Sequence, residues 1–356
     1  MYINYECLYS KKLEEGETMS LSIHIRKKLV NFTLEVNIDI EDGNFALLGA
    51  SGSGKSMLLK CIAGIEKPDE GRIVINDHVV FDSNKNIHVK VQERKCGFVF
   101  QNYALFPNMT VTENIACGIK QKKHQSELLQ QLLIQYDLEE VKNSYPAYLS
   151  GGQQQRCAIA RTMASNPKIL LLDEPFSALD KPLKQKLIQD LKQVLTSFKG
   201  TTIFVSHDHE EVYRLANKVG ILERGKLIEL DDKVKVYHTP SHISCAKQVG
   251  IRNISCIDKI DSHTIYAKDW DIVLKINQEV QPFHTHIGIR ELQIQMLITN
   301  NVIDVEVIDT IQEIYGEYVI IRKKGSNTRG IICRKECVKS KKIYIPEESI
   351  FLMKSE

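Results

Sequence analysis

The chain has 356 residues and a mass of 40.7 kDa, with hydrophobic residues at 43%, charged residues at 26% and a formal net charge of +2. Because this length exceeds what one hydrophobic core usually serves, two folded domains are expected. The composition excludes a largely disordered chain and a membrane-spanning one, and the nearly balanced charge gives no reason to expect a nucleic-acid partner.

The first 19 residues lack the apolar core of a signal peptide, and we treat them as a leader of uncertain status. No apolar run in the sequence reaches the length of a membrane span. The cysteines are scattered, and the closest pair, Cys333 and Cys337, lacks the C-x-x-C spacing of a metal or redox motif. A cytoplasmic chain with buried, reduced thiols is therefore expected.

The segment from Leu21 to Ile75 indicates an α/β beginning: strand, strand, glycine-rich turn, helix and strand. Apolar residues alternate with polar ones over the second strand, at Leu34, Val36, Ile38 and Ile40. This alternation favours a half-buried strand at the edge of a sheet.

The middle of the chain changes from helical to strand-like patterns. Residues 121–145 carry leucines at helical spacing up to Pro146, which predicts an inserted helical lobe at about 101–160. The apolar runs Ile169–Leu172 and Thr202–Val205 flank the helical Leu183–Phe198. Such runs are typical of buried parallel strands in a doubly wound, mainly parallel sheet, which we predict to have an antiparallel β edge.

The composition shifts again near Thr239 and Pro240, where short strand patterns replace helices. These patterns cover residues 318–322, 331–333 and 343–345. We therefore predict a first domain over residues 20–236 and a small β-rich, barrel-like domain over residues 243–356.

Residues 49–56 satisfy the G-x-x-x-x-G-K-[ST] pattern between an apolar run and a helix-like segment. The loop contains Gly49, Ala50, Ser51, Gly52, Ser53 and Gly54, followed by Lys55 and Ser56. Its glycines allow backbone N–H groups to face an anion at the positive end of a helix. Lys55 is expected to reach the β- and γ-phosphates of ATP, and Ser56 to bind Mg²⁺. The flanking strand and helix argue against a loop that binds nothing.

Two acidic residues, Asp173 and Glu174, end the apolar run at 169–172. The carboxyl ends of strands are where open α/β sheets bind ligands. We expect Asp173 to hold Mg²⁺, through water, and Glu174 to polarise the attacking water as a general base. An acidic strand end alone indicates only a turn, but together with the loop it predicts ATP hydrolysis.

Residues 149–156, LSGGQQQR, resemble the signature segment of the ATP-binding cassette (ABC) family. Ser150 and Gln153 have the spacing of a capping box, which predicts a helix to about Ala164. The helix start, with Gly151 and Gly152, also suits an anion. In this family the segment closes over the γ-phosphate held by a second subunit, so the resemblance implies a homodimer with two ATP molecules at its interface.

The resemblance extends in order to Gln101, Asp180 and His207, and so covers one complete cassette. It implies that Gln101 lies near magnesium and water, that Asp180 belongs to a loop between the two cassettes, and that His207 contacts the γ-phosphate and holds Glu174 in register. Without the resemblance, a lone histidine after a strand is more often structural. Phe32 is the candidate for the aromatic residue that stacks on adenine, and is equally a core residue of a Phe32–Ile40 strand.

Residues 100–111, FQNYALFPNMTV, resemble the glutamine loop of importer cassettes. In those proteins a membrane permease docks on this segment, so the resemblance implies docking near Gln101–Pro107 at the cytoplasmic face of the cell membrane, with an extracytoplasmic solute-binding protein as an indirect partner. Packing of Tyr103, Leu105 and Phe106 against the helical lobe is the alternative.

The carboxyl-terminal region resembles the regulatory β-domains of importer ATPases through His286–Arg290. Across the chain the nearest resemblance is to molybdate and sulfate importer ATPases, which predicts an ATPase that powers oxyanion import. The β-domain either binds an oxyanion or supports a dimer. Import of a sugar, a polyamine or iron is the main alternative. The Tyr103–Pro107 stretch and the appended β-domain disfavour an exporter. A cassette acting on ribosomes or DNA is disfavoured because such proteins commonly carry two cassettes or long coiled-coil insertions.

Overall fold

The computed structural model describes residues 20–119, 125–177, 181–294, 300–314 and 316–355. The expected leader at residues 1–19 lies outside this part of the chain. Contacts divide the chain into two compact units between Leu227 and Ile228, earlier than the domain end that the sequence placed at residue 236. Within the described residues, no helix is long and apolar enough to cross a membrane.

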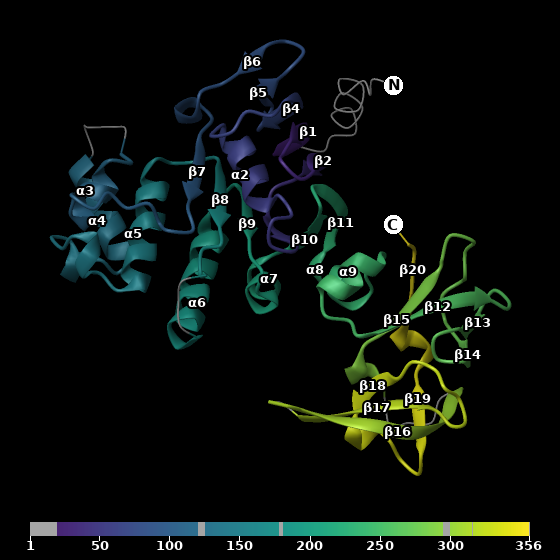
Figure 1. Ribbon diagram of the computed structural model, residues 1–356. Helices are drawn as coiled ribbons and strands as arrows, with labels where there is room; N and C mark the ends of the chain where they lie inside the picture. Colours follow the sequence, from purple (N-terminus) through teal and green to yellow (C-terminus); the bar gives the residue numbers. More distant parts are fainter. Residues whose placement is uncertain (1–19, 120–124, 178–180, 295–299, 315, 356) are drawn as a thin grey trace. The chain divides into compact units, whose positions relative to one another are not determined.

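An 11-stranded sheet has the order β6-β5-β4-β1-β2-β11-β10-β3-β9-β8-β7 (Figure 1). Its strands belong to the first unit, except that β11 begins there and continues past Leu227 into the second. Its strands are β1 (Leu21–Lys28), β2 (Thr33–Ile40), β3 (Asn44–Leu48), β4 (Glu70–Ile75), β5 (His78–Asp82), β6 (Ile87–His88), β7 (Cys96–Val99), β8 (Ile169–Asp173), β9 (Thr201–Val205), β10 (Lys218–Glu223) and β11 (Lys226–Asp232). From β10 to β7 the neighbouring strands are parallel, and from β2 to β6 they are antiparallel.

The strands β8 and β9 are buried at every position, as the uninterrupted apolar runs predicted. Parallel strands covered on both faces need no polar alternation. The prediction that the second strand is an edge strand is wrong: β2 shows the alternating burial but lies between β1 and β11. Alternation reports that one face is exposed, whereas an edge is defined by unpaired backbone groups.

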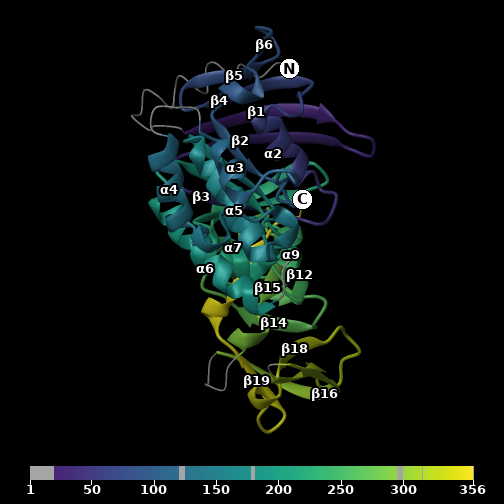
Figure 2. The same ribbon diagram turned by 90° about the vertical axis from the view of Figure 1, so that its left-hand side faces the viewer.

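The helices of the first unit are α2 (Lys55–Ala63), α3 (Val111–Ala116), α4 (Gln125–Gln135), α5 (Gly151–Ala164), α6 (Lys181–Ser197) and α7 (His209–Leu215). Short 3-10 helices occur at η1 (Val91–Glu93), η3 (Glu139–Val141) and η4 (Pro146–Tyr148). Helices α3, α4 and α5 pack against one another beside β7, where both views show them gathered (Figures 1 and 2). They form the helical lobe that the sequence predicted.

Within the lobe, the helical pattern over residues 121–145 is only partly realised. Helix α4 ends at Gln135 because Asp137 takes a left-handed conformation (φ 53) and the Leu138 N–H bonds back to the Leu133 carbonyl at 2.8 Å. This closure caps the carbonyl end of the helix. Pro146 therefore begins a separate turn, η4, and does not interrupt a long helix.

The second unit has two antiparallel sheets, ordered β14-β13-β12-β15-β20 and β18-β17-β16-β19. Its elements are α8 (Lys233–His238), α9 (Ile243–Gln248), β12 (Asn253–Lys259), β13 (Thr264–Ala267), β14 (Ile272–Lys275), β15 (His286–Ile289), η5 (Glu291–Gln293), β16 (Asn301–Glu313), β17 (Gly316–Lys323), β18 (Ile331–Arg334), η6 (Lys335–Cys337), β19 (Lys342–Ile345), η7 (Glu347–Ser349) and β20 (Ile350–Met353). Residues of both sheets share one apolar core around Trp270. The predicted small, barrel-like β-domain is therefore built from two curled antiparallel sheets.

The thiols are mostly buried, as expected. Burial raises the pKa of Cys61, Cys157 and Cys333 to about 12, so these thiols stay protonated. Cys117 is the exception, because it is exposed at the end of α3.

Candidate nucleotide site

The loop at residues 49–56 follows β3 and opens α2, as its pattern predicted. A Cβ at Gly49 would lie 2.2 Å from the Leu222 carbonyl oxygen, so the backbone approaches more closely than any side chain allows. Gly54 caps α2 in a left-handed conformation (φ 106) that glycine adopts at no steric cost. Both glycines are therefore required by the shape of the loop.

The ammonium group of Lys55 bridges the loop from inside. Its Nζ donates to the carbonyls of Gly49 at 2.8 Å and Ala50 at 2.9 Å. Burial lowers the pKa of Lys55 below its usual value, and the nearby Glu174 and Asp173 carboxylates oppose that shift. The lysine is thus a partly desolvated cation held by neutral acceptors, which a phosphate anion can replace.

Asp173 ends β8 next to the start of α2, and its Oδ1 accepts a hydrogen bond from Ser56 Oγ at 2.7 Å. Burial raises the pKa of Asp173, and the Ser56 hydroxyl opposes the shift. A hydroxyl and a buried carboxylate side by side are oxygen donors of the kind that Mg²⁺ prefers. The residues predicted to hold Mg²⁺ at this point fit that ion.

Glu174 takes a left-handed backbone conformation (φ 47), and its N–H donates to the Val205 carbonyl at 3.1 Å. Its Oε2 accepts from Gln101 Nε2 at 3.2 Å and lies 3.6 Å from His207 Nδ1. His207 follows β9 and its side chain is 67% exposed, against 24% for Glu174. The structure therefore brings together all three residues that the sequence proposed as catalytic.

A cavity of about 550 Å³ opens beside these residues. Its lining is formed by Lys60, Phe100, Gln101, Asn102, Asp173 and Ser177. Asp180, which the family resemblance assigns to a loop between the two cassettes, lies outside the described residues. The cavity joins the end of β7 to the end of β8, so the magnesium and water positions inferred from the sequence fall on one edge of the sheet.

The signature residues form a closed local structure at the start of α5. Ser150 Oγ accepts from the Gln153 N–H at 3.3 Å, and the Ser150 N–H donates to Gln153 Oε1 at 2.9 Å. Helix α5 ends at Ala164, so the predicted capping box and helix length are both confirmed. No hydrogen bond within the described residues joins Ser150, Gly151, Gly152 or Gln153 to residues 49–56 of the same chain.

Phe32 precedes β2 instead of belonging to it, because the strand begins at Thr33. A Cβ at Gly54 would lie 3.4 Å from Phe32 Cε2, and one at Gly225 would lie 2.8 Å from the same atom. The half-buried ring thus rests on two glycine turns beside the loop. This position suits an adenine ring next to the bound phosphates.

Residues 101–107 divide into a buried and an exposed part. Tyr103 is buried, and its hydroxyl lies 3.5 Å from the Pro175 carbonyl oxygen, so the expectation of an exposed loop is wrong for this residue. Phe106 is 47% exposed and Pro107 is exposed. Packing therefore accounts for Tyr103, whereas Phe106 and Pro107 are exposed to solvent.

Two residues that the sequence analysis missed hold this loop in place. Arg161 donates to the carbonyls of Ala104 at 2.7 Å and Tyr103 at 2.9 Å. Asn114, fully buried, accepts from the Phe106 N–H at 2.9 Å. Neither belongs to a motif. Arg161 reaches a loop 57 residues away, whereas Asn114 bonds to the loop just before its own helix. The only available signal is a polar residue on an apolar helix face.

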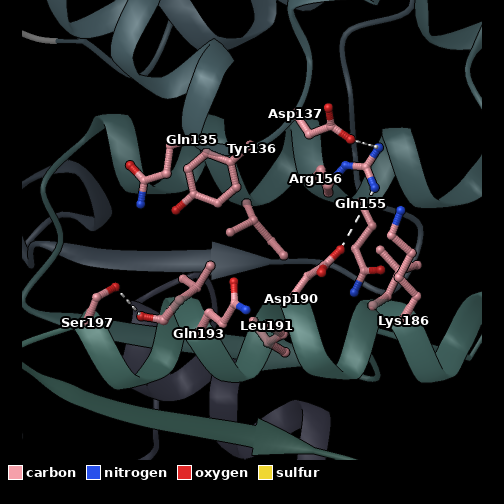
Figure 3. A pocket seen from close by; sticks show the side chains of 13 residues that line it. Gln135, Tyr136, Asp137, Gln155, Arg156, Lys186, Asp190, Leu191, Gln193 and Ser197 are labelled. Carbon is pink, nitrogen blue, oxygen red and sulfur yellow. Dashed lines mark hydrogen bonds and ion pairs between the residues drawn. The ribbon is translucent and has the colours of Figure 1, made fainter.

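A second cavity in this unit, of about 350 Å³, lies among α4, α5 and α6 (Figure 3). Arg156 there faces Asp137 at 3.6 Å and Asp190 at 3.9 Å. Gln155 is 1% exposed, and its amide atoms have no hydrogen-bond partner within the described residues. None of the nucleotide-site residues lines this cavity.

Comparison with known proteins agrees with this geometry. Residues 34–177 match the family model described as ABC transporter. A probable sulfate/thiosulfate import ATP-binding protein from Chlorella vulgaris is 42% identical over 66% of this chain and 100% of its own length. The chain belongs to the ABC transporter family. As a member, it has the fold of an ATP-binding and ATP-hydrolysing cassette.

Other relatives have the same kind of name. A sulfate/thiosulfate import ATP-binding protein from Synechocystis is 41% identical over 63% of each chain. An Fe(3+) ions import ATP-binding protein from Haemophilus influenzae is 35% identical over 75% of this chain and 76% of its own. The predicted family is thus confirmed.

Solved structures confirm the fold. A dimeric, post-hydrolysis ATP-binding cassette, MJ0796, bound to ADP and Pi, matches with a TM-score of 0.51 at 30% identity, over 60% of this chain and 98% of its own. A cassette of Clostridium perfringens, described as part of the ABC transporter complex cbiONQ, matches with a TM-score of 0.54 at 26% identity, over 62% of this chain and 91% of its own.

Proposed function

We propose that this ABC cassette hydrolyses ATP with Mg²⁺ and thereby powers the import of an inorganic oxyanion, sulfate being the first choice, through separate membrane subunits. The observation that carries the proposal is the convergence of Gln101 and His207 on Glu174, beside the Ser56–Asp173 pair. This convergence supports the assignment of a phosphate-binding loop, a cation-binding pair and a water-orienting carboxylate to the carboxyl ends of the parallel strands.

Phosphate binding begins at the loop. The N–H groups at the start of α2 face the β-phosphate, and Lys55 Nζ exchanges its Gly49 and Ala50 carbonyl partners for phosphate oxygens. The negative phosphate oxygens then pair with the positive charge of Lys55, and this offsets the cost of burying that charge. Phe32 stacks on the adenine from the neighbouring turn.

Ser56 and Asp173 hold Mg²⁺, with Gln101 as a further oxygen donor. The ion neutralises negative charge that develops on the transferred phosphoryl group. The buried Asp173 carboxylate gains a cation in place of the Ser56 hydroxyl, which reverses the effect of burial on its pKa.

Glu174 orients the attacking water and accepts its proton. Gln101 donates to Glu174 Oε2, and His207 approaches the same oxygen. Because both contacts fix one carboxylate oxygen, the other is left for the water. His207 in addition contacts the γ-phosphate from its exposed position after β9.

A second copy of the chain completes each site. Ser150 and Gln153 satisfy one another and present the start of α5 outward, so this anion-binding end is available to ATP held by another cassette. The dimeric MJ0796 cassette supports a homodimer here. Asp180 takes part in communication between the two copies.

The membrane subunits dock at Phe106 and Pro107, whose exposure suits a helix from a permease. Arg161 lies 5.3 Å from the Phe106 ring and also holds the loop that leads back to Gln101. A movement of the docked permease helix is thereby transmitted to Gln101, which is hydrogen-bonded to Glu174. The chain acts as a peripheral protein at the cytoplasmic face of the cell membrane.

The choice of substrate rests on the names of the relatives, among which sulfate and thiosulfate import recurs. The relative from Haemophilus influenzae favours iron as the second candidate. Co-purification with native membrane subunits, followed by labelled-sulfate uptake in proteoliposomes, distinguishes the two. Uptake of Fe³⁺ but not sulfate would overturn the oxyanion assignment and leave the ATPase intact.

The ATPase assignment is tested with Glu174→Gln. The glutamine amide keeps the shape of the carboxylate, and its oxygen can still accept the hydrogen bond from Gln101. It cannot accept a proton from water, so hydrolysis should fall by about 100-fold or more while ATP binding is retained. An ATP-dependent dimer should accumulate on size-exclusion chromatography. Undiminished hydrolysis would remove Glu174 from the proposed role.

A further inference from the structure

Three metal-ligating side chains meet in the second unit, away from any predicted site. Glu229 lies on β11, His242 immediately precedes α9, and Cys245 lies in the first turn of α9. Their ligand atoms all lie within 4.8 Å of one another. No other such group of three occurs within the described residues.

The distances suit a small cation. Glu229 Oε2 lies 3.4 Å from His242 Nδ1. A tetrahedral zinc ion with bonds of about 2.0–2.1 Å to oxygen and nitrogen holds these two atoms about 3.3 Å apart. His242 is the N-cap of α9 and Cys245 is the third residue of that helix, and their ligand atoms lie within 4.8 Å of one another.

The environment of the cluster favours a bound cation over a bare carboxylate. Glu229 is 8% exposed and Cys245 is 0% exposed. A carboxylate at such a depth needs compensation, and the Ser241 N–H contributes, at 3.2 and 3.1 Å from its two oxygens. One carboxylate and one thiolate together neutralise a divalent ion, so the whole group can be buried without net charge.

A simple ion pair between His242 and Glu229 accounts for two of the three residues. The Cys245 sulfur adds a third ligand atom within 4.8 Å of the other two. The mixed oxygen, nitrogen and sulfur donor set is typical of zinc, because Mg²⁺ and Ca²⁺ prefer oxygen alone.

We propose that Glu229, His242 and Cys245 bind a divalent cation of the zinc class and so fasten β11 to α9. On binding, the Cys245 thiol loses its proton to solvent and its sulfur donates an electron pair to the ion, while His242 and Glu229 donate from Nδ1 and Oε2. Water completes the coordination. No electron is transferred, and affinity must fall as pH is lowered because a proton competes for the sulfur.

The first test is Co²⁺ titration of the full, tag-free, nucleotide-free wild-type chain, followed by displacement with Zn²⁺. A thiolate-to-cobalt charge-transfer absorption should saturate at an equimolar amount of metal and disappear when zinc is added. Zinc should also raise the melting temperature, and EDTA should reverse the rise. Absence of the absorption in the wild-type chain overturns the proposal without any variant.

Variants assign the ligands. Cys245→Ser should abolish the absorption, and His242→Gln should weaken cobalt binding by about 100-fold. Cys256→Ser is the matched control: Cys256 Sγ also lies beside an imidazole, 3.1 Å from His286 Nε2, but outside the group of three. It should titrate like the wild type. Equal binding by the Cys245 and Cys256 variants would place the metal elsewhere and refute the site, and circular dichroism verifies that each variant is folded.

Discussion

Asn114→Asp is predicted to make the nucleotide-binding unit sensitive to pH. The Asn114 amide is fully buried and holds the loop after Gln101 through both of its ends. Its Oδ1 accepts from the Phe106 N–H, and its Nδ2 donates to the Phe106 carbonyl at 3.2 Å, to that of Met109 at 3.0 Å and to that of Thr110 at 3.0 Å. An ionised aspartate would direct a negative oxygen at these three carbonyl oxygens.

The magnitude follows from proton linkage. The carboxyl must stay protonated in the fold, so its pKa there is raised above the unfolded value of about 3.9. A raised pKa means that stability is retained below the unfolded value and is lost as pH rises toward the folded one, by about 1.4 kcal/mol per pH unit. From pH 5 to pH 7 the variant should lose about 3 kcal/mol relative to the wild type, in addition to about 1 kcal/mol for the lost N–H donor.

The assay is thermal or urea unfolding followed by circular dichroism between pH 5 and pH 8, because the single tryptophan, Trp270, reports on the other unit. Hydrogen exchange of residues 106–116 locates the effect. Asn108→Asp is the control, since Asn108 is exposed in the same loop and its carboxylate is hydrated. Parallel pH profiles for the two variants would refute the reasoning.

Two further substitutions test the nucleotide loop and the adenine contact. Gly49→Ala should reduce ATP affinity by at least about 100-fold, because the new Cβ, 2.2 Å from the Leu222 carbonyl oxygen, forces the loop open. Gly52→Ala is the control: its new Cβ has nothing within 4 Å, so it should cost only about 1 kcal/mol of stability. Equal ATP affinities of the two variants, measured by calorimetry, would contradict this prediction. Phe32→Ala should weaken ATP binding about tenfold while Phe32→Tyr preserves it; a fall in melting temperature with unchanged affinity would instead make Phe32 a core residue.

The sequence by itself determined the features that depend on contiguous residues. The loop at 49–56 and the Ser150–Gln153 capping box are made by groups a few residues apart, so the spacing of residues in the sequence fixes their local geometry. Asp173 and Glu174 could be placed because strand ends of a parallel sheet share one edge. The family resemblance supplied the order of Gln101 and His207 along the chain.

The tertiary structure alone decided which distant groups meet. The position of β2 inside the sheet, the burial of Tyr103 and the support of its loop by Arg161 follow from packing between segments far apart in the chain. The meeting of Glu229 with His242 and Cys245 is of the same kind. The Asn114 amide bonds to residues only a few positions away, but these bonds form only when the loop folds back onto α3. Local patterns record what each residue prefers, whereas these contacts exist only once the chain has folded and buried groups must find partners.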